Sequence, residues 1–273
     1  TTDISVTKVW DDNNNKAGVR PASIQVQLYA DETPQGDPVE LNEENSWKYT
    51  WKDLDKYADG TEISYRVDEV SEIDGYLKSV TANEENTEYV ITNTITSVKI
   101  TKVDISDAHE LEGAHLQILD SNGTVVAEWD SAKEAREVTG LKTGELYTLR
   151  ETVAPDGYTI TTDTTFELDE HGKLKEDKTT TNTKDGVLLV EDARTVEVSK
   201  VDLGTGEELD GAHIQVLDKA GNVVDEWDSK KGETHKVKNL TVGQEYTLRE
   251  TVAPNGYTLT TDTTFTIDRT GKV

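Results

Sequence analysis

The sequence contains a long internal repeat. Residues 98–131 match residues 196–229, and the match continues through YTLRETVAPDGYT (147–159) and YTLRETVAPNGYT (246–258) to a shared TTDTTF. Self-similarity of this kind means that one folding unit is used more than once. The chain must therefore fold as small modules. We predict that the two copies span residues 97–194 and 195–273.

The first part of the chain, residues 1–96, is a more distant relative of this unit. It opens with ISVTKVW, carries YRVDEVSEIDGY where the copies carry YTLRETVAPDGY, and closes with YVITNTI. In all three units a glutamate precedes a Gly-Tyr pair by six residues. These glutamates are Glu69, Glu151 and Glu250. We therefore predict three domains, which are called modules one (1–96), two (97–194) and three (195–273).

Local sequence patterns favour an all-β fold. Runs rich in Thr, Val and Tyr are short, and turn sequences such as DSNG, PDG and ADG separate them. Long helical periodicity is absent from the sequence. Short strands at regular spacing are typical of an antiparallel sandwich. We predict tandem Ig-like antiparallel β-sandwich domains.

Charge and composition exclude several functions. The formal net charge of −27 argues against nucleic acid as a partner, because a phosphate backbone needs a basic surface. The chain has no cysteine, so neither a disulfide framework nor a thiolate metal site can form. An extracellular protein of this kind would need another covalent reinforcement.

Ionisable residues share the phase of the apolar residues in several predicted strands. Period-2 alternation places Glu151 with Tyr147, Leu149 and Val153, and Glu250 occupies the same place in module three. The opening strands place one lysine each on the apolar face: Lys8, Lys102 and Lys200. We therefore expect buried charges in every module.

The closing strands of modules one and two add a third polar group. Asn93 is in phase with Tyr89 and Ile91, and Asp192 is in phase with Leu188 and Val190. Burying such groups without partners costs several kcal/mol or more. Two interpretations are open: a hydrogen-bonded buried salt bridge, or a spontaneous amide between the lysine and the Asn or Asp side chain.

An amide could form here without any cofactor. An apolar site favours the neutral lysine, which is the nucleophile, and the protonated carboxyl group. A protonated glutamate could polarise the side-chain carbonyl group and relay protons as ammonia or water leaves. Folded strands would hold the reacting atoms together at a high effective concentration.

These residues resemble a known family. Their arrangement is similar to the Cna B-type and SpaA-like domains of Gram-positive surface adhesins and pilins, and YTLRETVAPDGY resembles the pilin E-box. The resemblance covers essentially the whole chain. It implies a structural stalk or shaft on the extracellular, cell-wall-anchored surface of a Gram-positive bacterium, with the anchor outside this fragment.

The resemblance also implies roles for individual residues. Module two is similar to the domain behind the SpyCatcher and SpyTag pair, with SVKITKVD as its lysine strand and VLLVEDA as its aspartate strand. This similarity implies a bond between Lys102 and Asp192, with Glu151 as the catalyst. The Cna B-type pattern of module one implies a bond between Lys8 and Asn93. Its catalyst would be Glu69.

Module three departs from this pattern. Lys200 and Glu250 are present, but the chain stops at Val273, which aligns with Leu174 of module two. Nothing corresponds to residues 175–194, so we expect this module to lack its last strand. Either truncation removed that strand, or the module accepts a complementary strand in trans.

Other functions have weaker support. DDNNN (11–15) lacks the Gly and Glu of a calcium-binding EF loop, and the five histidines form no evident ligand cluster. We find no catalytic triad, so we expect no enzyme beyond single-turnover amide formation. The expected partners are neighbouring domains, with no nucleic acid and no direct membrane contact. An adhesive module that binds a host matrix protein or glycan is the alternative.

Overall fold

A computed structural model describes residues 1–268 and 271–273. The described residues form β-strands, with one 3-10 turn, η1, at Glu176–Lys178. The prediction of an all-β fold is therefore confirmed. The chain forms two compact units. One comprises Thr1–Val98, Val138–Glu145 and Leu168–Lys173, and the other comprises Lys99–Glu137, Leu146–Glu167 and Leu174–Val273. The predicted boundaries between the three modules stay a prediction.

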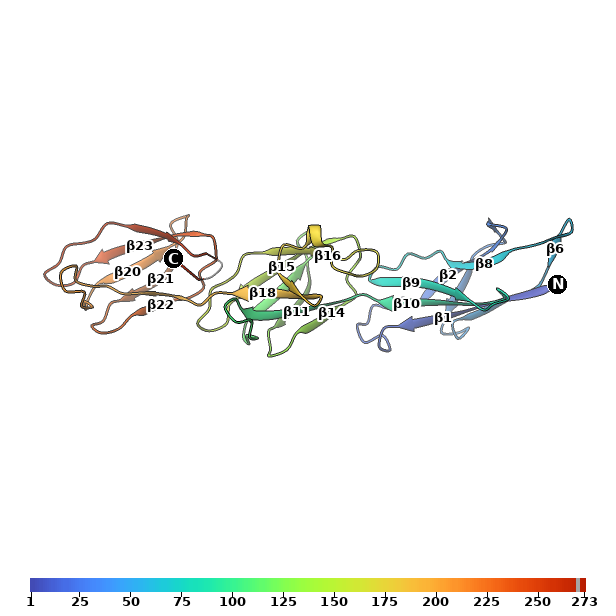
Figure 1. Cartoon of the computed structure of the whole chain (residues 1–273), viewed down its shortest axis with the longest axis horizontal. Coiled ribbons are helices and arrows are strands. Elements are labelled where there is room, and N and C mark those ends of the chain that lie inside the picture. The colour runs from blue at the N-terminus through green and yellow to red at the C-terminus, as the bar shows by residue number, and fades with distance from the viewer. Residues whose placement is uncertain (269–270) are drawn as a thin grey trace. The chain divides into compact units, whose positions relative to one another are not determined.

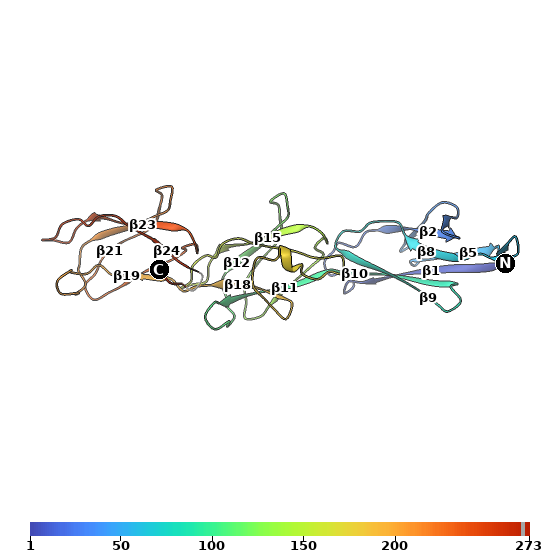
Figure 2. The same cartoon turned by 45° about the horizontal axis from the view of Figure 1, so that its top comes forward.

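Module one contains two packed sheets. One sheet has the order β5-β1-β10-β9, and in the other β2 pairs with β3, β4 and β8 (Figures 1 and 2). A separate small hairpin, β6-β7, completes the module. The strands are β1 (Thr2–Asp11), β2 (Ser23–Ala30), β3 (Thr33–Pro34), β4 (Val39–Asn42), β5 (Lys48–Leu54), β6 (Tyr57–Ala58), β7 (Thr61–Glu62), β8 (Tyr65–Glu69), β9 (Tyr76–Ala82) and β10 (Glu88–Ile95).

Module two has two four-stranded sheets, with the orders β14-β11-β18-β17 and β13-β12-β15-β16. The strands are β11 (Ser97–Asp104), β12 (His115–Leu119), β13 (Val125–Asp130), β14 (Arg136–Thr139), β15 (Leu146–Val153), β16 (Thr164–Glu167), β17 (Thr183–Lys184) and β18 (Val187–Asp192).

Module three repeats the second of these sheets as β21-β20-β23-β24. Its other sheet contains only the pair β19-β22 among the described residues. The strands are β19 (Val196–Val198), β20 (His213–Leu217), β21 (Val223–Asp228), β22 (His235–Val237), β23 (Glu245–Val252) and β24 (Thr263–Thr266).

The first and last strands of modules one and two pair in parallel. β1 pairs with β10, and β11 pairs with β18, whereas the other pairs in their sheets with a described register are antiparallel. The sequence analysis did not predict this direction. The parallel pairs place the opening and closing strands side by side, which brings their polar residues together.

Alternating side chains build the core of each module. On β1, Ile4, Val6 and Lys8 are buried, and on β15, Tyr147, Leu149 and Glu151 are buried. The expected alternation fails at Val153, which is 51% exposed. Here the register between β12 and β15 shifts, so Val153 leaves the face that carries Glu151.

Candidate functional site

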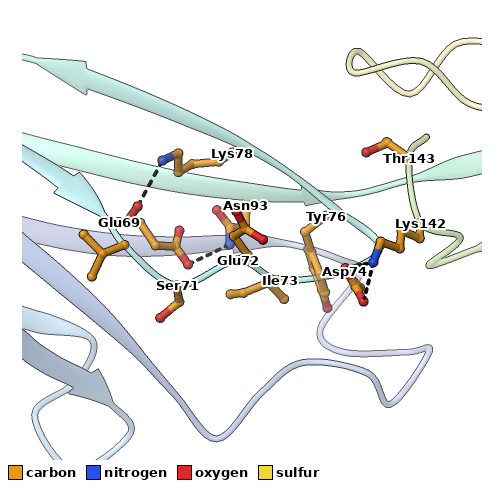
Figure 3. A pocket seen from close by; sticks show the side chains of 12 residues that line it. Glu69, Ser71, Glu72, Ile73, Asp74, Tyr76, Lys78, Asn93, Lys142 and Thr143 are labelled. Carbon is orange, nitrogen blue, oxygen red and sulfur yellow. Dashed lines mark hydrogen bonds and ion pairs between the residues drawn. The ribbon is translucent and has the colours of Figure 1, made fainter. Parts of the chain in front are cut away.

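Module one brings Lys8, Glu69 and Asn93 together in its core. Lys8 lies on β1, Glu69 ends β8, and Asn93 lies on β10. The Lys8 Nζ atom lies 3.2 Å from Glu69 Oε2. Asn93 Nδ2 donates a hydrogen bond of 3.2 Å to Glu69 Oε1 (Figure 3). All three residues are buried. Glu69 therefore bridges the other two residues, with Oε2 on the lysine and Oε1 on the side-chain amide of Asn93.

Burial shifts Lys8 towards its neutral form. It lowers the pKa of Lys8 to about 8, although the nearby Glu69 acts to raise it. The Trp10 ring, whose centre lies 4.5 Å from Nζ, also opposes this shift, because the face of an aromatic ring attracts a cation. A lysine with this pKa has about a tenth of its molecules as free amine at pH 7, which is the nucleophilic form.

The two polar atoms of the Asn93 side chain have different contacts. Its Oδ1 atom is buried and has no hydrogen-bond partner among the described residues. The side-chain nitrogen, Nδ2, is the atom that contacts Glu69. The glutamate therefore holds the nitrogen that an attacking lysine would displace.

A pocket of about 430 Å³ opens beside Glu69 and Asn93 (Figure 3). Lys78 lines it and donates hydrogen bonds to Asp68 Oδ1 at 2.7 Å and to the main-chain oxygen of Glu69 at 3.0 Å. Residues 70–75, which join β8 to β9, form much of the rest of its lining.

Module two assembles the corresponding cluster from Lys102, Glu151 and Asp192. These residues lie on β11, β15 and β18. The Lys102 Nζ atom lies 3.0 Å from Glu151 Oε1 and contacts Asp192 Oδ1 directly. None of the three side chains is exposed. The main-chain N–H of Thr161 donates to the other glutamate oxygen, Oε2, at 2.9 Å.

The electrostatics of this cluster favour a protonated aspartate. Burial raises the pKa of Asp192 to about 8, with the neighbouring Lys102 opposing the shift and Glu151 adding to it. Neither carboxylate oxygen of Asp192 has a hydrogen bond of ordinary geometry within the described residues. A neutral carboxyl group in contact with a lysine nitrogen is the arrangement from which an amide can form.

Module three retains two of the three groups. Lys200 Nζ lies 3.1 Å from Glu250 Oε1, and Thr260 N–H donates to Glu250 Oε2 at 2.7 Å. Lys200 follows the end of β19, and its side chain is 13% exposed. Burial acts to raise the pKa of Glu250, but the hydrogen bonds from Thr260 and Lys200 outweigh it, so the pKa is lowered.

Sequence reasoning missed a hydrogen bond that recurs in all three modules. The tyrosine of each Gly-Tyr pair donates from its hydroxyl group to an aspartate that lies shortly after the lysine in sequence. The pairs are Tyr76 with Asp12 at 3.0 Å, Tyr158 with Asp104 at 2.8 Å and Tyr257 with Asp202 at 2.7 Å. The Gly-Tyr pairs recur in the sequence, but the aspartate stands four residues after the lysine in module one and two residues after it in modules two and three, so the shared contact left only a weak signal.

The structure also places His109 near two carboxylates, which the sequence analysis did not foresee. Its ligand atoms and those of Asp104 and Asp107 lie within 4.8 Å of one another. Asp104 already accepts hydrogen bonds from Ser106 and Tyr158, and His109 pairs with Asp107. These groups satisfy one another without an ion.

Comparison with known families agrees with the geometry. A model of the Cna protein B-type domain matches residues 4–94. A model of the prealbumin-like fold domain matches residues 96–184 and 194–273, which together are more than half of the chain. The chain belongs to the prealbumin-like fold domain family, and it opens with a Cna B-type domain. The predicted family is therefore confirmed.

Individual relatives match only in part. The collagen adhesin of Staphylococcus aureus is 43% identical over 101 residues, which cover 37% of this chain and 8% of the adhesin. The pilus adhesin SpaC of Lactobacillus rhamnosus GG, in its open conformation, aligns with 99% of this chain and 39% of its own, at 19% identity and a TM-score of 0.49. Two B repeat units of the S. aureus collagen-binding protein align with 94% of this chain and 70% of their own, at 24% identity and a TM-score of 0.33.

The chain thus spans less than half of the first two of these relatives. In the described residues no helix is long and apolar enough to cross a membrane.

Proposed function

We propose that this chain is a structural segment of a Gram-positive cell-surface adhesin or pilin, and that two intramolecular isopeptide bonds stabilise it. One bond joins Lys8 to Asn93, and the other joins Lys102 to Asp192. Membership of the family supports the structural role. The observation that carries the bonds is the contact of Lys102 Nζ with a buried Asp192 beside Glu151.

In module two the reaction releases water. The lone pair of the neutral Lys102 amine attacks Asp192 Cγ, and a C–N bond forms while the carbonyl electrons move to oxygen. Glu151 accepts one proton from the nitrogen through Oε1 and passes it to the departing hydroxyl group. The carbonyl group reforms as water leaves. The proton count balances, because the glutamate ends as it began.

In module one the reaction releases ammonia. The Lys8 amine attacks Asn93 Cγ, and Glu69 transfers one amine proton to Nδ2, which leaves as ammonia when the C–N bond breaks. Glu69 suits this transfer because it contacts both nitrogens. The pocket beside Asn93 offers the ammonia a route to solvent.

A simple buried salt bridge explains the structure less well. In a salt bridge, Lys102 and Glu151 would stay buried as two ions beside the neutral carboxyl group of Asp192. Removing ions from water costs several kcal/mol for each ion. Amide formation removes the lysine ammonium group and the Asp192 carboxyl group together, so fewer ionisable groups remain in the apolar core.

The mass of the denatured chain tests this proposal. Loss of one ammonia and one water predicts a mass about 35 Da below that of the sequence. After allowance for the substitution itself, Glu151→Ala should restore about 18 Da and Glu69→Ala about 17 Da. Glu250→Ala is the matched control, and it should leave the deficit unchanged. A native chain with the full sequence mass would refute both bonds.

Module three receives only a partial assignment. Lys200 and Glu250 are proposed to take the lysine and glutamate roles, because their separation of 3.1 Å matches that in module two. No partner is assigned to them. The module boundaries near residues 96 and 194, and an extracellular, cell-wall-anchored location, belong to the same proposal.

A further inference from the structure

An exposed ion pair adjoins each of the three glutamates that contact a buried or nearly buried lysine, Glu69, Glu151 and Glu250. The residue immediately before Glu151 is Arg150, whose guanidinium group contacts both carboxylate oxygens of Asp163 at 2.6 to 3.1 Å. The same fork joins Arg249, before Glu250, to Asp262 at 2.7 to 3.2 Å. The forks lie on the outer face of strands whose inner face carries the glutamates.

Module one has an ion pair with reversed charges before its glutamate, but the partner lies on β9, in the other sheet. Asp68 precedes Glu69, and its partner is Lys78, with 2.7 Å between Lys78 Nζ and Asp68 Oδ1. Lys78 lies opposite Asn93 in the ladder between β9 and β10. The pair therefore ties the end of the glutamate strand to the neighbour of the strand that carries Asn93. What recurs is an ion pair made by the residue before the glutamate, with either polarity and with a partner on a different element in module one.

Stability alone does not explain the pairs. Arg150 and Asp163 each expose 43% of their side chains, and Lys78 and Asp68 expose 40% and 36%. Exposed ion pairs contribute only about 0 to 1 kcal/mol, because water screens the charges and ordering long side chains costs entropy. A geometrical role fits their position better.

In module two the Arg150–Asp163 ion pair holds the segment before β16, for which the structure describes no strand-to-strand hydrogen bonds with β15. The pairing of β15 with β16 ends at Leu149 and Thr164, and Asp163 lies one residue beyond that last pair. Two residues earlier, Thr161 N–H holds Glu151 Oε2 at 2.9 Å. This contact leaves Oε1 facing Lys102. Module three repeats it through Thr260 and Glu250.

We propose that the Arg150–Asp163 pair is a positioning device for the crosslink of module two. Asp68–Lys78 serves module one through a different contact, the hydrogen bond of 3.0 Å from Lys78 to the main-chain oxygen of Glu69. Each pair holds the glutamate of its module so that one oxygen faces the lysine. Loss of the fork frees the segment around Thr161, and Glu151 loses the donor that fixes its orientation. This inference rests on the proposed function, because it assumes that the crosslink forms.

The rate of crosslinking tests the inference. The full chain is made by cell-free synthesis, samples are denatured in acid at intervals, and protease digestion with mass spectrometry counts both crosslinks. The rate at which the Lys8–Asn93 bond forms in the same sample serves as the internal reference. Relative to that reference, Arg150→Gln should slow formation of the Lys102–Asp192 bond about tenfold or more, because a small misplacement of reacting groups lowers the reaction rate strongly.

Two further variants separate positioning from general damage. Exchange of the charges, Arg150→Asp with Asp163→Arg, copies the polarity of module one and should restore most of the rate. Lys133→Gln is the matched control, because it removes another exposed pair of the same module, with Glu112 at 3.3 Å, and should not change the rate. The melting temperature of each variant in a Glu151→Ala background reports its effect on folding alone.

The outcomes are distinct. If Arg150→Gln crosslinks at the native rate, or if the exchanged pair is as slow as Arg150→Gln, the positioning role is wrong. A slow Arg150→Gln whose uncrosslinked form is already unfolded at the assay temperature would also overturn it. If the native chain forms neither crosslink, the proposed function fails first, and the mass deficit reports that separately.

Discussion

At the scale of single residues, Asp12 shows how a buried carboxylate keeps its charge. Arg20 donates two hydrogen bonds to it at 2.6 and 2.9 Å, and the main chain of Asn15 and the hydroxyl group of Tyr76 donate two more. Hydrogen bonds to the charged form stabilise it. The Arg20 guanidinium is the largest cause, and it lowers the pKa of Asp12 to about 2 against the opposing effect of burial.

This pKa predicts how module one responds to acid. Because the pKa of Asp12 is lower in the folded state, its stabilisation is present above pH 4 and is lost as the pH falls towards 2. It amounts to at most about 2 kcal/mol. In a Glu69→Ala background, Asp12→Asn should lower the calorimetric transition of module one at pH 7. The difference should shrink between pH 4 and pH 2, and a constant difference would contradict the prediction.

Burial of individual side chains was predicted correctly where it follows from strand alternation and wrongly where it depends on the neighbouring strand. Alternation alone placed Lys8 and Glu151 on buried faces, because a strand with one buried side imposes a period of two. It failed at Val153, because a register shift depends on the pairing partner. The bond between Tyr76 and Asp12 joins residues 64 positions apart, and no local pattern encodes such a contact.

At the scale of elements, two parallel strand pairs position the reacting groups. Lys8 lies opposite Ile91, and Lys102 lies opposite Val190, so each proposed partner stands two residues further along the closing strand. The long lysine side chain covers this offset of about 7 Å. The sequence predicted where strands form and which side of each strand is buried. Alternation does not specify which strands pair or in which direction they run, so the parallel pairing could not be predicted.

The two strand pairs should give crosslinks with different pH dependence. Burial lowers the pKa of Lys8 to about 8, so its neutral amine fraction rises through that pH and levels off above it. Burial raises the pKa of Asp192 to about 8, so its reactive neutral form is lost above that pH. Between pH 7 and pH 9 the rate of Lys8–Asn93 bond formation should rise more steeply than that of the Lys102–Asp192 bond, because the loss of the neutral Asp192 carboxyl group opposes any gain in free amine.

Timed digestion of freshly synthesised chain at several pH values would measure both rates in one sample. Glu151→Ala is the control, because its Lys8–Asn93 rate should follow the native profile. If both crosslinks accelerate by the same factor up to pH 9, the aspartate of module two does not react as a neutral carboxyl group.

At the scale of the whole molecule, the proposed bonds would replace the disulfides that this chain cannot make. The sequence has no cysteine. Each bond joins the first strand of a module to its last strand, so a pulling force would pass through the amide and leave the residues between unloaded. The hydrogen-bonded sheets of modules one and two would then carry little of the load.

Force spectroscopy on single chains would reveal this load path. Between Lys8 and Asn93, and between Lys102 and Asp192, the chain could extend by about 300 Å in each module if it unfolded freely. The native chain should show neither extension, because the amides hold both segments closed. A Glu69→Ala, Glu151→Ala double variant should show both. Module three, for which no bond is assigned, should extend in both chains and so mark each molecule that was pulled correctly. Three extensions in the native chain would show that modules one and two are held by hydrogen bonds and packing alone.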